Sequence, residues 1–157
     1  MAIRQLSTGD DPVLRKRAAE VNTFGERLAM LIDDLFDTLE AENGVGLAAP
    51  QVGISRRIIV VKIGEDRFEL VNPILEKAEG RFVAVEGCLS LPGLYGEVER
   101  AARVLVRGRD RTGKETTVEG DELLARALQH EIDHLDGILF TDKALRFLEP
   151  EEPSGGR

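Results

Sequence analysis

The feature that most constrains this chain is the pentapeptide H-E-I-D-H at residues 130–134, inside a run of helical periodicity at residues 121–136. Residues four apart lie on one face of an α-helix, so both imidazoles project to the same side. Two neutral imidazoles at this spacing can form two corners of a tetrahedral metal site. Glu131 lies about 100° round the helix from His130. That position suits a base beside metal-bound water better than a third metal ligand.

The rest of this helix predicts a central, buried element. Leu123 and Ala127 share the histidine face, and a neighbouring apolar stripe would anchor the helix in the core: Leu124, Leu128, Ile132 and Leu135. The chain contains no other histidine, and histidines are seldom buried unless their polar atoms are engaged. We therefore favour a metal site over a helix with two ordinary surface histidines.

Composition bounds the class of protein. A chain of 157 residues predicts one domain at residues 1–148, followed by a disordered acidic tail at residues 149–157. No apolar run approaches the ~20 residues of a membrane span, and no signal peptide is recognisable. One cysteine fits a reducing compartment, so we expect a cytoplasmic protein. A net charge of −8 argues against nonspecific nucleic-acid binding.

Further secondary structure follows from capping and periodicity. Residues 23–26 have capping-box spacing, and an amphipathic N-terminal helix follows, with an apolar stripe at Leu28, Leu31, Ile32, Leu35, Phe36 and Leu39. Asn43-Gly44 should end it. Strands are predicted at residues 57–63, 68–71, 74–78, 81–85, 97–100, 103–109 and 115–118. Five arginines between residues 100 and 111 are expected on a solvated face, namely Arg100, Arg103, Arg107, Arg109 and Arg111.

Two other segments carry chemistry-bearing residues. Residues 44–53, GVGLAAPQVG, are small apart from Gln51, and by themselves favour a tight turn between helix and strand. Residues 86–93 hold the only cysteine, Cys88, among glycine and proline that suggest an exposed loop. A lone cysteine is more often a small buried apolar residue than a ligand. A thiolate would nevertheless suit a transition metal that needs a third ligand.

Three choices of third ligand compete on the residues alone, and two of them remain open. The extended motif H-E-x-x-H-x-x-G-x-x-H fails because Phe140 stands where its last histidine would be. A downstream glutamate would have to be Glu149, Glu151 or Glu152. The third choice is Cys88, if its loop folds against the helix.

Three motifs in order, GVGLAAPQVG, EGCLS and QHEIDHLDG, resemble the signature motifs of the peptide deformylase family. The resemblance extends from about Leu14 to Phe140. It implies an α+β fold in which antiparallel sheets pack around the central metal-binding helix. It also implies a metal-dependent hydrolase that removes the formyl group from the N-terminal formyl-methionine of new proteins.

The resemblance also implies residue roles. Cys88, His130 and His134 would bind one divalent metal ion, Fe²⁺ in the cell, with Zn²⁺, Ni²⁺ or Co²⁺ as alternatives. Glu131 would be the general acid and base, while Gln51 and the backbone N–H of Leu89 would stabilise the oxyanion.

The same resemblance implies which residues bind the substrate. Gly46 would contact the peptide backbone, and the methionine side chain would enter a pocket lined by Val45, Glu86, Leu123, Arg126 and Ala127, with Tyr95 at its mouth. Glu86 and Arg100 match a structural pair of the family.

The resemblance implies partners for the enzyme. The partners would be N-formylmethionyl nascent peptides and the ribosome near its exit tunnel. Some relatives dock through a basic C-terminal extension, which the acidic tail here does not resemble. The alternatives are a zinc peptidase of broader specificity and a non-catalytic binding module that contains a metal.

Overall fold

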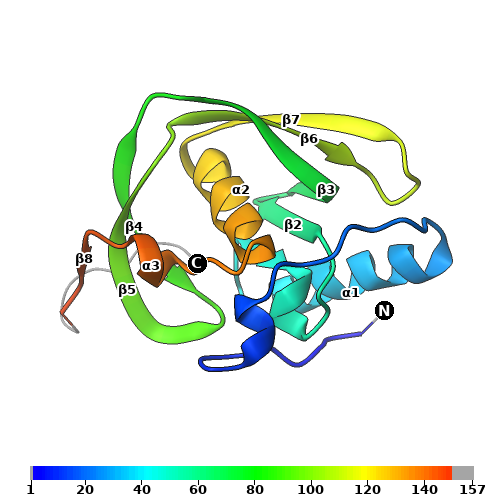
Figure 1. The fold of residues 1–157 in the computed structure, drawn as a ribbon, viewed down its shortest axis with the longest axis horizontal. Coiled ribbons are helices and arrows are strands. Elements are labelled where there is room, and N and C mark those ends of the chain that lie inside the picture. Colours follow the sequence, from blue (N-terminus) through cyan, green and yellow to red (C-terminus); the bar gives the residue numbers. More distant parts are fainter. Residues whose placement is uncertain (1, 150–157) are drawn as a thin grey trace.

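The computed structural model describes residues 2–149 and has an α+β fold with two antiparallel sheets (Figure 1). One sheet has the strand order β1-β2-β3-β6-β7, and the other has the order β4-β5-β8. The helices are α1 (Glu26–Ala41), α2 (Glu122–Leu135) and α3 (Phe140–Lys143), with 3₁₀ turns η1 (Pro12–Arg15) and η2 (Ala49–Val52). The strands are β1 (Gly46–Ala48), β2 (Ile58–Ile63), β3 (Asp66–Glu79), β4 (Phe82–Cys88), β5 (Leu91–Arg100), β6 (Arg103–Arg109), β7 (Glu115–Asp121) and β8 (Arg146–Phe147).

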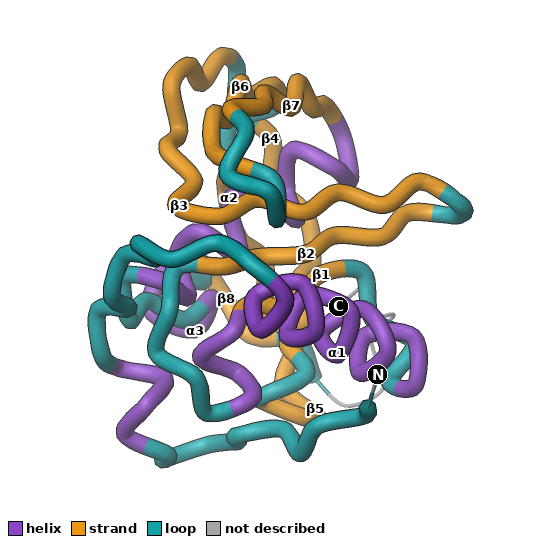
Figure 2. Tube along the Cα trace, turned by 90° about the vertical axis from the view of Figure 1, so that its right-hand side faces the viewer, coloured by secondary structure: helices purple, strands orange, loops and turns teal. Residues whose placement is uncertain are grey.

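Strand β2 separates the two helical layers. Its side chains alternate between faces, as the period of a strand requires. Ile58 and Val60 pack in the core that holds the apolar face of α1, whereas Ile59 and Val61 pack in the core under α2. Figure 2 shows α1 below β1 and β2, and Figure 1 shows β6 and β7 arching over α2. Helix α2 is therefore enclosed by β1 and β2 and by β7, which it contacts.

The predicted helix at residues 121–136 is confirmed as α2. Asp121 is its N-cap residue, but its side chain makes no capping hydrogen bond. Gly137 follows the helix with φ of +74°, and a Cβ there would lie 2.5 Å from the carbonyl oxygen of Arg15. Glycine is thus required both by the left-handed turn and by the close passage of the N-terminal segment.

Several local predictions were wrong. Helix α1 begins after Gly25 without a side-chain cap, so the predicted capping box does not form. The segment expected as a turn supplies strand β1, which pairs with β2. Strand β3 continues through Asn72-Pro73 because a register shift between Val71 and Ile74 absorbs the interruption. Cys88 is not in an exposed loop: it ends β4 and is buried.

The predicted disordered tail covers residues 149–157, of which all but residue 149 lie outside the described part of the chain. Within residues 2–149, no helix is both long and apolar enough to cross a membrane.

Candidate active site

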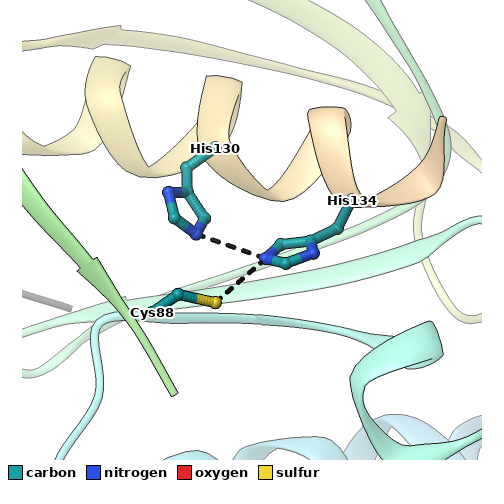
Figure 3. A group of neighbouring side chains, drawn as sticks. All are labelled: Cys88, His130 and His134. Carbon is teal, nitrogen blue, oxygen red and sulfur yellow. Dashed lines mark hydrogen bonds between the residues drawn. The ribbon is translucent and has the colours of Figure 1, made fainter. Parts of the chain in front are cut away.

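Helix α2 and strand β4 bring three ligand-type atoms together (Figure 3). His134 Nε2 lies 3.3 Å from His130 Nε2 and 3.3 Å from Cys88 Sγ, and all three side chains are buried. Figure 3 shows both rings leaving one face of α2 toward the sulfur at the end of β4. The one-turn spacing of the histidines and the position of Cys88 just before the β4–β5 turn are what create this cluster.

The neighbours of the rings leave both Nε2 atoms facing inward. His130 Nδ1 donates to Glu86 Oε1 at 2.9 Å, which turns its Nε2 inward. Burial lowers the pKa of His130, but hydrogen bonds to Cys88 and Glu86 outweigh it and raise that pKa well above its ordinary value, so a metal ion would take the place of the proton on Nε2. Burial, together with the charges of His130 and Arg100, lowers the pKa of His134 well below its ordinary value. His134 Nδ1 is buried without a hydrogen-bond partner. A neutral imidazole is the form that binds metal.

This arrangement fits a metal ion. Zinc-type distances of about 2.0–2.1 Å to nitrogen and about 2.3 Å to sulfur place tetrahedral ligand atoms about 3.3–3.6 Å apart. The two nitrogen atoms are 3.3 Å apart, which agrees with that range, and the sulfur lies 3.3 Å from His134 Nε2, at its lower end. All three atoms lie within 4.8 Å of one another. Inward lone pairs at this distance repel unless a cation or proton lies between them, so the donor set itself favours a bound cation. Among residues 2–149 the only group of this kind contains Cys88 and not a downstream glutamate.

Glu131 presents its carboxyl group beside this cluster. Its Oε1 is buried and has no hydrogen-bond partner. Burial raises the pKa of Glu131 to about 7, although the charges of His130 and Arg100 oppose this rise. A carboxyl group with a pKa near neutrality can both accept and return a proton at physiological pH. A Cβ at Gly46 would lie 2.6 Å from Glu131 Oε2, so the bare backbone of β1 is what makes room for the carboxyl group.

The amide of Gln51 approaches the cluster from η2. Its Oε1 accepts a hydrogen bond from the backbone N–H of Ala48 at 2.9 Å, which leaves Nε2 as the end that faces Cys88 Sγ, 3.5 Å away. Leu89 directly follows Cys88 and is buried. Gln51 therefore lies at the cluster, and Leu89 is the neighbour of Cys88 in the chain.

A small pocket opens next to the histidines. It contains all six residues predicted to bind substrate, and its lining is Val45, Gly46, Glu86, Gly87, Leu123, Arg126, Ala127, His130 and Glu131. Arg126 is half-buried and also lines a neighbouring surface hollow with Phe82 and Arg103. Tyr95 does not line the pocket; a Cβ at Gly87 would meet its ring at 2.7 Å, so it packs behind that glycine.

The expectation that Arg100 is solvated was wrong. Arg100 is buried and donates to both carboxylate oxygens of Glu86, at 2.5 and 2.8 Å, and to Asp133 at 3.0 Å. Lys143 of α3 also pairs with Asp133. A buried guanidinium needs such partners, and the pairing of Glu86 with Arg100 agrees with the resemblance.

Two contributors went unnoticed in the sequence. Asp133 lies inside the helical motif at the position three residues after His130, which could have marked it as a partner of the site. Ser90, two residues after Cys88, is fully buried and contacts Gln51, but no pattern in the sequence distinguishes it from a turn serine.

Comparison with known proteins identifies the family. The model of the polypeptide deformylase family matches residues 3–149. The chain belongs to the peptide deformylase family. Peptide deformylase from Caldicellulosiruptor bescii is 54% identical over 152 residues, covering 97% of this chain and 92% of that protein. Peptide deformylase from Alkaliphilus metalliredigens is 56% identical over 146 residues, covering 93% and 99%. The crystal structure of peptide deformylase from Thermotoga maritima superposes with a TM-score of 0.90 at 39% identity, covering 93% of this chain and all of that one.

Family membership gives the activity. Peptide deformylases are metal-dependent hydrolases that remove the N-formyl group from nascent peptides, and this chain is such an enzyme. The mixed helix and antiparallel-sheet fold predicted from the resemblance is confirmed by the same structures.

Proposed function

We propose that Cys88, His130 and His134 hold one divalent metal ion, and that α2 is the metal-binding helix of the fold. The observation that carries this proposal is the convergence of one sulfur and two nitrogen atoms, all buried, within 4.8 Å of one another. A metal bound there would polarise the formyl group and lower the pKa of a coordinated water from ~15.7 toward ~7. A thiolate with two imidazoles suits Fe²⁺, Zn²⁺, Ni²⁺ and Co²⁺, and we propose Fe²⁺ in the cell.

Glu131 moves the protons of the reaction in this proposal. Its unpartnered Oε1 accepts a proton from the attacking water and then delivers it to the amine that leaves the formyl carbon. A carboxyl pKa of about 7 makes both transfers accessible near neutral pH. Formate and a free N-terminal amine result.

Gln51 and Leu89 stabilise the charge that develops on the formyl oxygen. Gln51 Nε2 and the backbone N–H of Leu89 are the donors, and both residues are buried, where such hydrogen bonds are strongest. Loss of one such donor typically costs about 2.7–4 kcal/mol of barrier.

The methionine side chain occupies the pocket beside the histidines. Apolar contact comes from Val45, Leu123, Ala127 and the aliphatic stem of Arg126. Glu86 also lines the pocket, but its carboxylate is hydrogen-bonded to Arg100. Gly46 allows the peptide backbone to approach β1. We further propose that residues 1–148 act as one catalytic domain on nascent chains in the cytoplasm, near the ribosomal exit tunnel.

The test is metal-dependent formate release. Protein purified without oxygen is stripped of metal, loaded separately with Fe²⁺, Ni²⁺ or Zn²⁺, and assayed with formyl-Met-Ala and with unformylated peptides. We expect formate release that is fastest with Fe²⁺ and no cleavage of peptide bonds. Cys88→Ala should lose both tight metal binding and turnover. Metal retained by that variant, together with cleavage of internal peptide bonds, would instead support a peptidase with another third ligand. Bound metal without any turnover would support the binding module.

A further inference from the structure

The side chain of Gln51 is held at both ends. Its Oε1 accepts from the Ala48 N–H at 2.9 Å, while its Nε2 donates to Ser90 Oγ at 3.1 Å and lies 3.5 Å from Cys88 Sγ. Gln51 and Ser90 are both inaccessible to solvent, at 1% and 0% exposure. Water therefore does not compete for these hydrogen bonds.

The three contacts involve different atoms of the Gln51 amide and constrain it in different ways. The Ala48 N–H can only donate, so it fixes which end of the amide carries the oxygen. Ser90 Oγ then fixes the direction of Nε2 by accepting one of its two N–H groups. The other N–H donates to Cys88 Sγ at 3.5 Å, and sulfur is a weaker acceptor than oxygen. That second N–H therefore lies on the side of the metal ligands.

The backbones of the two residues are fixed independently of this hydrogen bond. The N-terminal segment donates from Ser7 N to the Gln51 carbonyl at 2.7 Å, and from Gly9 N to the Ser90 carbonyl at 2.9 Å. Ser90 also sits in the two-residue turn between Cys88 and Leu91, which pair across β4 and β5. Loss of the hydroxyl should therefore free the amide without displacing either loop.

We propose that Ser90 is a positioning residue for deformylation, whose hydroxyl holds the Gln51 amide so that one N–H faces the formyl oxygen. The inference rests on the proposed role of Gln51 as an oxyanion donor. Ser90 does not touch the reacting atoms in this account; it acts only through Gln51.

The first test observes the amide directly. In zinc-loaded, ¹⁵N-labelled protein, the side-chain NH₂ signals of the three glutamines are assigned by substitution. We expect Gln51 to show two well-separated proton signals with slow hydrogen exchange, and Ser90→Ala to accelerate that exchange. Gln129, whose amide bonds to Ala101 and Ala125, is the internal control and should not change. Fast hydrogen exchange of the Gln51 side-chain NH₂ group in the unsubstituted protein would by itself overturn the proposal.

The second test is a double-mutant cycle in kcat. Ser90→Ala should lower kcat about three- to tenfold, the effect of one buried hydrogen bond, with KM little changed. Gln51→Ala should lower kcat about 10²- to 10³-fold. In the Gln51→Ala background, Ser90→Ala should have less than about a twofold effect, because its partner is gone.

A matched control separates positioning from folding. Thr38→Val removes another fully buried hydroxyl, which bonds to the Asp34 carbonyl at 2.8 Å in α1, and should lower the Tm without changing kcat. Two results would overturn the role of Ser90. One is that Ser90→Ala lowers kcat equally in the protein with Gln51 and in the Gln51→Ala variant, and the other is that it lowers kcat in neither. An unchanged kcat in Gln51→Ala would remove the proposed oxyanion donor itself, which is a separate failure.

Discussion

At Gly46 the backbone of β1 lies directly against the carboxyl group of Glu131. A Cβ at this position would be 2.6 Å from Oε2 and 2.9 Å from Cγ of Glu131. Gly46→Ala should therefore displace the carboxyl group. Displacements of about 1 Å in a catalytic group can cost about 10²-fold in rate. We expect kcat for formyl-Met-Ala to fall about 10²-fold while the metal content remains near one per chain.

Gly25→Ala provides the comparison for that change. No heavy atom lies within 4 Å of a Cβ added at Gly25, and its extended backbone accepts any residue. This variant should retain full activity. A Gly46→Ala enzyme as active as Gly25→Ala would show that Glu131 does not need its present position.

Single residues were predictable where a motif carries its own geometry. The two histidines could be paired from their one-turn spacing, and Cys88 was one of two third ligands that the residues alone left open. Ser90 was not predictable, because its importance comes from burial against Gln51, a residue that is distant in the sequence. Burial of Arg100 was missed for the same reason: an arginine on a strand resembles its solvated neighbours until its partners are known.

The β4–β5 hairpin is joined to α2 by a buried ionic network. Arg100 on β5 bonds to Glu86 on β4 and to Asp133 on α2. Removing one partner of a buried pair leaves an uncompensated charge and costs about 3–5 kcal/mol. We expect Arg100→Leu to lower the free energy of unfolding in urea by that amount, and also to weaken metal binding because His130 loses its oriented partner, Glu86.

Arg81, the residue just before β4, is the matched control. It pairs with Glu99 at 3.4 Å but is 81% exposed. An exposed pair contributes about 0–1 kcal/mol, so Arg81→Leu should be nearly neutral. Equal destabilisation by the two substitutions would contradict the network's role.

At the scale of elements, hydrophobic periodicity predicted the helices, but it did not predict where some strands begin and end. The apolar stripes of α1 and α2 predicted which faces are buried. Strand β1 was missed because its residues, Gly46–Ala48, are too few and too small to show alternation. The continuity of β3 through a proline depends on a bulge that forms only against its partner β6.

The stability of the whole molecule should depend on pH through Glu86. Burial alone would raise the pKa of Glu86, but hydrogen bonds from Arg100 and His130 outweigh it and lower the pKa to about 2, from an ordinary 4.5. A lowered carboxyl pKa stabilises the fold fully above pH 4.5, and this contribution is lost as the pH falls toward 2. It amounts to at most about 3 kcal/mol.

Urea unfolding of metal-free protein between pH 7 and pH 3 measures this effect. The unsubstituted protein should exceed Glu86→Gln in stability at pH 7, and the difference should shrink steadily below about pH 4.5. A difference that stays constant down to pH 3 would show that Glu86 does not titrate as the structure requires.

The arrangement of the whole molecule was predictable only in outline. The resemblance implied antiparallel sheets around a central helix, and the structure has them. The strand order and the passage of the N-terminal segment beside Gln51 and Ser90 arise from contacts between distant residues. Local patterns carry no information about such contacts.

The central claim is that Glu131 transfers protons beside a metal held by Cys88, His130 and His134. Glu131→Gln tests it most directly, because the amide has the same shape but cannot accept the proton. We expect the variant to keep about one metal ion per chain and its Tm, while formate release from formyl-Met-Ala falls at least about 10²-fold. Formate release at the unsubstituted rate from metal-loaded Glu131→Gln would contradict the account.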